Sequence, residues 1–178
     1  MNARLLRRDV LTLLGAAAAC PFAARAANGR ARIGVLMSVA ETDPEAPLRV
    51  ARFHEGLAEG GLGEADVEVT WRWVEADPSW MADSARALVE MAPDVLVGSA
   101  TPQTAALLAL TSEIPLVFGL VADPVGSGFA ESLARPGHNA TGFINFEASL
   151  AGKWVDLMRE AVPGVTHLTM MFNPGTAV

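Results

Sequence analysis

The regular alternation of short apolar runs with longer amphipathic segments constrains this fold most. Segments of crossover length between strands join them in parallel, and such sheets are covered by helices. The pattern therefore predicts an α/β fold, a doubly wound, mostly parallel five-stranded sheet with helices on both faces, in the flavodoxin-like order 2-1-3-4-5. The predicted strands are Arg32–Met37, Asp66–Val74, Asp94–Gly98, Ile114–Val121 and Thr141–Asn145.

The segments between these strands carry helix signals. The second strand, Asp66–Val74, alternates apolar with polar residues, which is typical of an edge strand with one solvated face. Helices are expected from about Pro47 to Gly60, from Pro78 onward with Asp77 as the N-cap, and from Thr101 to about Thr111.

The stretch Ile114–Gly142 combines a buried strand with two turn-rich loops. The strand is followed directly by the turn cluster Asp123–Gly128, and we expect a short helical segment from there to about Ala134. A second loop, Arg135–Gly142, leads into the last strand. Polar groups just beyond the carboxyl end of a buried parallel strand lie where open α/β sheets bind ligands.

In the order 2-1-3-4-5 the ligand crevice opens between strands 1 and 3. The candidate ligand-binding residues are the polar side chains that follow the strands, Ser38, Ser99, Thr101, Asp123 and Asn145. The third strand runs into a helix start, whose free N–H groups suit a ligand carboxylate. Two alternatives stay open: Thr101 can simply cap its helix, and Asp123 can organise its own turn instead of binding a ligand ammonium.

The first 26 residues have the layout of an export signal. Three arginines, Arg4, Arg7 and Arg8, precede the apolar run Val10–Ala19, and Ala24–Ala26 matches an A-x-A cleavage site. The apolar run is shorter than the roughly 20 residues that a membrane span needs. We expect export to the periplasm and cleavage near the end of this motif. The Arg pair resembles a twin-arginine signal, although valine stands where that pattern has phenylalanine.

Cys20 is the only cysteine, and it lies inside this signal. A lipidated Cys20 is an alternative, although the three alanines before it match that pattern poorly. After cleavage near Ala26 the chain has no thiol, which excludes disulfides and a cysteine nucleophile. Nine Lys and Arg then face 19 Asp and Glu, a net charge of −10. An acidic body without a basic cluster argues against nucleic acid or an anionic membrane as partner.

The sequence offers no evident catalytic or metal-binding set. The three histidines, His54, His138 and His167, lack the spacing of metal ligands, and no phosphate-binding or nucleophile motif is present. The four tryptophans could form an aromatic cage, but their spacing favours strand faces and helix packing. We expect no enzyme activity, no metal and no cofactor.

Residues 115–142 read P-x-V-F…DPV…G-F-x-x-S-L-A-R-P-G-x-N-x-T-G. This pattern resembles the solute-binding proteins of ABC importers, in the branch with a type-1 periplasmic-binding fold that includes aromatic amino-acid binders. The resemblance extends from the signal-like N-terminus to Asn173-Pro174. It implies a periplasmic receptor that binds a small solute, an amino acid or a small carboxylate-bearing molecule, between two lobes and delivers it to an ABC permease.

The resemblance also implies a domain organisation. Residues 1–26 form the signal, 27–146 an N-terminal Rossmann-like lobe, and 147–178 the start of a second lobe with one helix and the strand Thr166–Phe172. The second lobe is then incomplete, so this chain looks like a fragment that is not competent alone. Two alternatives remain: an exported flavodoxin-like enzyme of the two-lobed racemase type, whose paired cysteines are missing here, and a non-functional truncated gene product.

Overall fold

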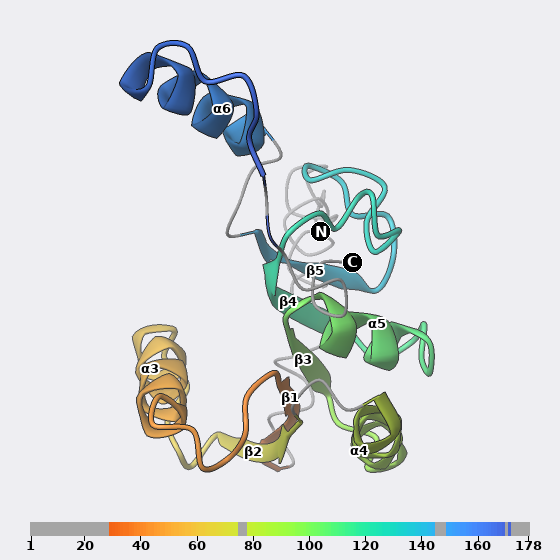
Figure 1. The fold of residues 1–178 in the computed structure, drawn as a ribbon. Helices are drawn as coiled ribbons and strands as arrows, with labels where there is room; N and C mark the ends of the chain where they lie inside the picture. Colours follow the sequence, from red (N-terminus) through yellow and green to blue (C-terminus); the bar gives the residue numbers. More distant parts are fainter. Residues whose placement is uncertain (1–28, 75–77, 145–148, 170, 172–178) are drawn as a thin grey trace, which may run out of the picture.

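The computed structural model describes residues 29–74, 78–144, 149–169 and 171. These residues form an all-parallel five-stranded sheet in the order β2-β1-β3-β4-β5, which confirms the predicted fold class and places β2 at an edge (Figure 1). The strands are β1 Ala31–Met37, β2 Val67–Trp73, β3 Val95–Ser99, β4 Leu116–Val121 and β5 Ala140–Ile144.

Helices lie on both sides of the sheet. Figure 1 shows α3 on one side, beside β1 and β2, and α4 with α5 on the other. The described helices are α3 Ala46–Glu59, α4 Pro78–Glu90, α5 Thr101–Leu108 and α6 Ser149–Ala161. Among the described residues, none of these helices is long and apolar enough to span a membrane.

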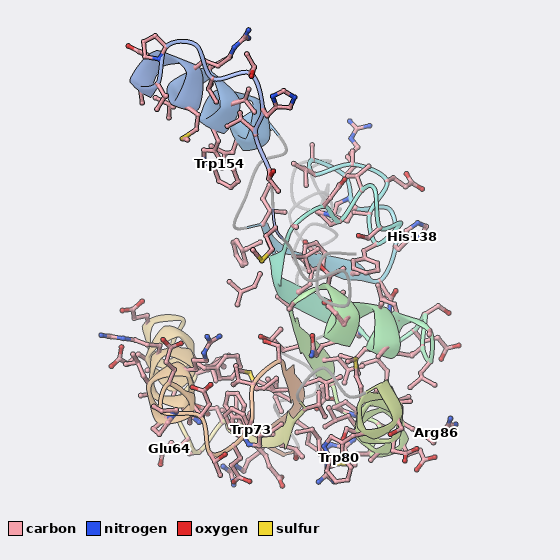
Figure 2. The ribbon with its side chains drawn as sticks, in the orientation of Figure 1. Glu64, Trp73, Trp80, Arg86, His138 and Trp154 are labelled. Atoms are coloured by element: carbon pink, nitrogen blue, oxygen red, sulfur yellow. The ribbon has the colours of Figure 1, made fainter. Side chains whose placement is uncertain are left out.

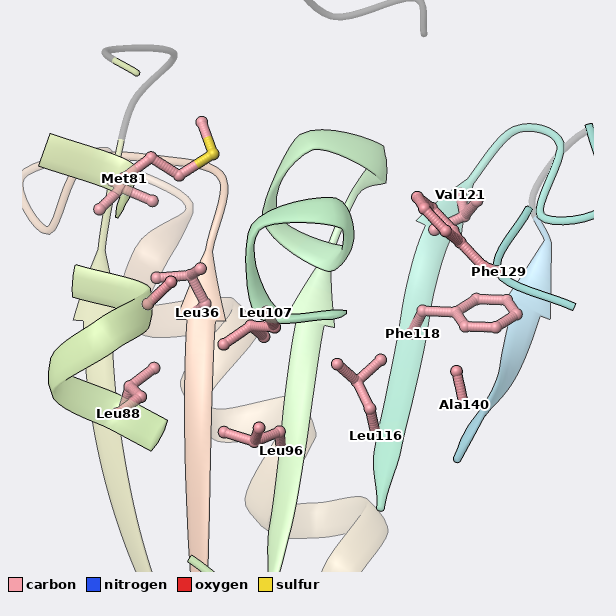
Figure 3. Packing of buried hydrophobic residues seen from close by; sticks show 12 residues of the cluster. Leu36, Met81, Leu88, Leu96, Leu107, Leu116, Phe118, Val121, Phe129 and Ala140 are labelled. Atoms are coloured by element: carbon pink, nitrogen blue, oxygen red, sulfur yellow. The ribbon is translucent and has the colours of Figure 1, made fainter. Parts of the chain in front are cut away.

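The larger hydrophobic core lies between the sheet and the pair α4 and α5. Leucines from the strands and both helices are fully or almost fully buried there, and Figure 3 shows them along neighbouring strands and on the two helices that cover them. Helix α5 approaches β3 closely, because a Cβ added at Gly98 would lie 2.7 Å from Thr104 Oγ1 and 3.0 Å from its Cα. The leucines of this core are Leu36, Leu88, Leu96, Leu107 and Leu116.

The opposite face of the sheet is covered only in part. Helix α3 packs through Phe53 and Leu57 against β1 and β2. An apolar hollow of about 790 Å³ lies beside α3, and its wall includes Leu57 of α3 together with Val97 of β3 and Val117 of β4. Further along, Phe143 of β5 is 77% exposed. We call β3, β4 and β5 on this side the open half of the sheet.

Two expected elements are absent from the described residues. The helical segment expected up to Ala134 is wrong, because residues 122–139 form turns and loops. Backbone bonds within the turn cluster, such as Phe129 N–H to Pro124 O at 2.8 Å, bury Phe129 and Ala130 without a regular helix. The strand expected at Thr166–Phe172 is also wrong for residues 166–169 and 171. An isolated strand has no neighbour to pair its backbone groups.

Candidate functional site

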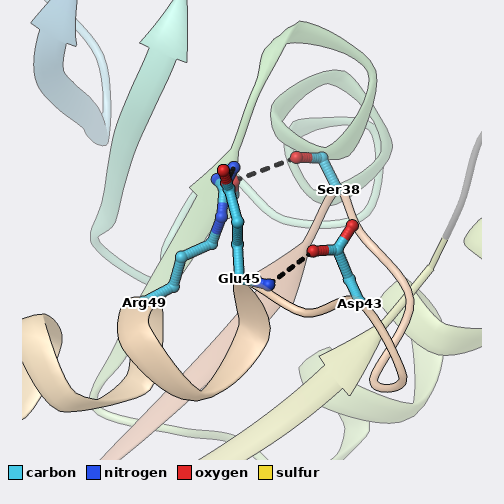
Figure 4. Close-up of polar contacts among 5 residues, drawn as sticks. Ser38, Asp43, Glu45 and Arg49 are labelled. Carbon is cyan, nitrogen blue, oxygen red and sulfur yellow. Dashed lines mark hydrogen bonds and ion pairs between the residues drawn. The ribbon is translucent and has the colours of Figure 1, made fainter.

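Two of the predicted site residues, Ser38 and Ser99, meet at the carboxyl ends of β1 and β3. Their hydroxyl oxygens lie 3.2 Å apart, a hydrogen bond in which either group can donate (Figure 4). The sheet order reverses between these two neighbouring strands, which is the switch point where such sheets bind ligands. Ser99 is 9% exposed and Ser38 is half-buried. The pair thus lies where the sequence predicts the crevice.

Helix α5 begins directly after this serine pair. Its N-cap is Ala100, which offers no side-chain hydrogen bond, and Thr101 is the first helical residue, 4% exposed. The alternative that Thr101 caps the helix is therefore wrong. The first N–H groups of a helix have no intrahelical partner, so the helix start can donate to a ligand oxygen.

The backbone at the helix start is strained. Ala100 has φ 86° and ψ 166°, a region that is otherwise almost restricted to glycine and costs roughly 1–3 kcal/mol. Leu120, after the facing position on β4, also has a positive φ of 58°. A hydrogen bond of 2.8 Å from Ala100 N–H to Gly119 O links the two strand ends. Backbone strain of this kind concentrates at binding sites, so it adds support for a ligand site at the carboxyl ends of β3 and β4.

Gln103 is a buried polar residue that the sequence analysis missed. It lies in the first turn of α5, is 3% exposed, and its Oε1 has no hydrogen-bond partner within the part of the chain that the structure describes. A buried acceptor without a partner is costly, so water or a ligand N–H is expected to satisfy it. The sequence feature that could have identified Gln103 is its position directly after Thr101-Pro102, in the first turn of the predicted helix.

Asp123 follows β4 at the same edge, but it serves its own turn. Its Oδ1 accepts a hydrogen bond from Gly126 N–H at 2.8 Å, and its carbonyl accepts one from Ser127 N–H at 3.0 Å. Within the described residues, no hydrogen bond or ion pair joins Asp123 to the serine pair. The structure therefore supports the turn-forming alternative, and a ligand role for Asp123 remains a prediction. Asn145 lies outside the described residues.

A charged pair lies at the start of α3, after the loop that leaves Ser38 (Figure 4). Glu45 Oε2 and Arg49 Nη2 are 2.9 Å apart, and Glu45 N–H donates to Asp43 Oδ1 at 2.8 Å, which orders the loop after Ser38. Arg49 Nε is buried and has no partner among the described residues. No sequence pattern singles out this pair, because one Arg in a helix does not indicate a buried guanidinium nitrogen.

The remaining candidates are structural or surface residues. His54 contacts the rings of Phe53 and Trp71, with centroids 6.1 and 6.3 Å apart. In the described ranges, no group of His, Cys, Asp and Glu is arranged to hold a metal ion. The expectation of no metal and no cofactor remains a prediction.

Comparison with known proteins gives several similar chains. A tyrosine-binding protein of Clostridioides difficile (strain R20291) is 24% identical over 122 residues, 68% of this chain and 35% of that protein. An ABC domain in complex with L-Trp from Streptococcus pneumonia is 33% identical, with a TM-score of 0.59, over 65% of this chain and 39% of that one. A conserved domain protein of Vibrio cholerae is 33% identical, with a TM-score of 0.71, over 83% of this chain and 49% of that one.

This chain therefore spans about a third to a half of the length of the relatives that it matches. Residues 33–178 match the family described as ABC transporter substrate binding protein. Because this match covers most of the chain and the fold agrees with the lobes of solved relatives, the chain belongs to the ABC transporter substrate-binding protein family.

Proposed function

We propose that the described lobe forms one wall of a solute cleft in a receptor of an ABC importer. The observation that carries this proposal is the serine pair at the switch point, with the strained start of α5 beside it. Hydroxyl groups and free helix N–H groups together suit the carboxylate of an amino acid or another small acid. The two relatives named for tyrosine and L-Trp support an amino acid as the solute class. We infer no enzyme activity.

We further propose that residues 27–146 are the N-terminal lobe and that α6 opens a second one. The apolar face of α6 supports this, because Leu157 and Met158 are about half exposed and leave apolar area that another layer of structure could cover. Closure of two lobes supplies the second set of ligand contacts and excludes water. We therefore expect a chain that carries both lobes to bind solute far more tightly than these 178 residues alone.

Isothermal titration with amino acids tests the cleft. In a chain that carries both lobes, Ser99→Ala should weaken solute binding by about 0.5–1.5 kcal/mol, the net contribution of one hydrogen bond. The matched control is Ser112→Ala, an exposed serine between α5 and β4, which should leave affinity unchanged. Equal affinity of both variants and the unaltered protein would place the site elsewhere, and equal affinity of the 178-residue chain would refute the need for a second lobe.

Export is a separate part of the proposal. We infer that residues 1–26 direct the chain to the periplasm, that cleavage falls near Ala26, and that the receptor delivers its solute to a membrane permease. N-terminal sequencing of the processed protein should find a start close to residue 27, and a mature chain that begins at Met1 would contradict the inference. Arg7→Lys with Arg8→Lys should block export only if the twin-arginine route is used.

A further inference from the structure

We propose that the edge strand β2 is a self-association site, at which a second copy of this chain adds its own β2 in the antiparallel direction. β2 is the last strand at its end of the described sheet, and all seven of its residues pair with β1. In Figure 1 α3 and α4 lie on the two sides of the sheet and not beyond β2. An edge strand of this length leaves a row of backbone groups to which a second strand can pair.

The backbone groups of alternate β2 residues point away from the sheet. Ala31 N–H donates to Asp66 O at 2.8 Å, and Val74 N–H donates to Met37 O at 3.0 Å, so the even-numbered residues face β1. In a parallel pair the N–H and C=O of one residue point to the same side, and those of the next residue point to the other. The residues that present both groups at the free edge are therefore Val67, Val69, Trp71 and Trp73.

Side chains already bind the outward carbonyl at each end of this edge. Arg30 Nε donates to Val67 O at 3.0 Å, and Trp80 Nε1 donates to Trp73 O at 3.2 Å. Figure 2 shows the two indoles at the β2 end of the sheet. The middle of the strand is therefore the part that is open to a partner.

Val69 and Trp71 are the two middle residues that face outward. Within the described ranges, no hydrogen bond reaches their outward N–H and C=O groups. When two copies pair antiparallel about Thr70, Val69 of one lies opposite Trp71 of the other, and the two exchange both backbone hydrogen bonds. Because the arrangement is symmetric, the same pair forms again on the other side of Thr70.

The side chains of β2 are complementary to a second β2 in this register. Glu68 of each copy lies opposite Arg72 of the other; both side chains are exposed, and neither has an ion-pair partner in the part of the chain that the structure describes. They occupy non-hydrogen-bonded positions, where opposed side chains are closest. Opposite charges and aromatic residues beside β-branched ones both stabilise antiparallel strands. The pairs on the other face are Val69 with Trp71 and Val67 with Trp73.

The two charges also define the partner and the register. Charged side chains on an edge strand usually hinder pairing, because a foreign strand rarely offers the opposite charge at the same place. A second copy offers it twice. A slip by two residues in either direction would put Thr70 opposite Glu68 or Arg72 and would separate the two charges from each other.

The experiment measures the monomer–dimer equilibrium of the 178-residue chain by sedimentation equilibrium. Glu68→Arg replaces both attractive pairs of the symmetric dimer by repulsive ones, so dimerisation should weaken at least about tenfold. Arg72→Glu should have the same effect. The matched control is Glu113→Arg, which makes the same charge change at an exposed position between α5 and β4 and should leave the dimer unchanged.

Two combinations should restore the dimer. The double variant Glu68→Arg with Arg72→Glu exchanges the charges and should dimerise like the unaltered chain. An equimolar mixture of the two single variants should form a heterodimer, although each alone stays monomeric, because every Arg then meets a Glu. Recovery in either case would also show that the single variants are folded.

Amide hydrogen exchange tests the backbone pairing independently. Raising the protein concentration should slow exchange of the Val69 and Trp71 amides, which face the partner. The Thr70 amide faces β1 in the single chain already and should exchange at an unchanged rate, so it serves as an internal reference.

Three results would overturn the inference. The chain could stay monomeric at millimolar concentration, or a dimer could respond equally to Glu68→Arg and Glu113→Arg, as association through the exposed face of α6 would. Weakening by both single variants without recovery in the double variant or the mixture would reject the antiparallel register.

Discussion

The two faces of the sheet are built from alternate residues of the same strands, yet they end in different environments. On β3, Leu96 and Gly98 point toward α4 and α5, where side chains are fully packed. Val97 and Ser99 point to the other face, where Val97 borders an apolar hollow and Ser99 forms part of the serine pair. The face that packs against α4 and α5, which we call the closed face, holds the lobe together. The open half and the strand ends leave surface available for other contacts.

This comparison shows that stability and binding are separated by the two-residue period of a strand. Successive side chains point to opposite faces, so one strand can serve a packed core and a site at once. Substitutions along β3 therefore test the difference directly, because backbone, strand pairing and local sequence stay the same. The variants below are ordered from the largest expected effect to the smallest.

Leu96→Ala should have the largest effect. Leu96 is fully buried on the closed face, and removal of such a side chain leaves a cavity that the neighbours fill only in part. We expect the free energy of unfolding to fall by about 2–5 kcal/mol, measured by urea denaturation of the 178-residue chain. A loss below about 1 kcal/mol would show that this face is less tightly packed than described.

Gly98→Ala should be the next most damaging. The new methyl group would meet Thr104 Oγ1 at 2.7 Å and the Thr104 backbone at 3.0 Å, so α5 must shift away from β3. Overpacking of this kind costs about 1–3 kcal/mol in unfolding free energy. Gly119→Ala on the neighbouring strand is the control, because a Cβ there meets nothing within 4 Å. Equal losses in the two variants would contradict the close helix approach.

Ala100→Gly should stabilise the lobe. Glycine relieves the strain of the positive φ, roughly 1–3 kcal/mol, and loses about 0.5–1 kcal/mol in unfolded-chain entropy, for a net gain of about 1 kcal/mol. The matched control is Ala105→Gly in the interior of α5, which should destabilise by about 1 kcal/mol. The two variants remove the same methyl group, so thermal unfolding shifts of the same sign would contradict the strain at the site.

Val97→Ala should have the smallest effect. Val97 is half-buried on the open half of the sheet, and its replacement by alanine removes two methyl groups. A fully buried methylene contributes about 0.8 kcal/mol, so at half burial we expect a loss of about 1 kcal/mol or less in unfolding free energy. Urea denaturation next to Leu96→Ala provides the measurement. Equal losses of unfolding free energy in Val97→Ala and Leu96→Ala would contradict the contrast between the two faces.

The sequence by itself determined the fold class, the strand order and the edge position of β2. These follow from local patterns, because apolar periodicity and connection length restrict a parallel sheet to few topologies. The same reasoning placed Ser38 and Ser99 at the switch point, since their position depends only on where two strands end. It failed for residues 122–139, where turn hydrogen bonds outweighed the short apolar stretch that predicts a helix.

Tertiary structure alone decided the side-chain environments. The unpartnered Gln103 oxygen, the strained Ala100 and the Glu45–Arg49 pair depend on how α3 and α5 approach the strand ends. The hollow lined by Trp71, Trp73 and Trp80 likewise joins residues of β2, α4 and the loop after β1, which no local pattern connects. Periodicity reports which residues share a face, whereas contact between elements is set by packing over the whole lobe.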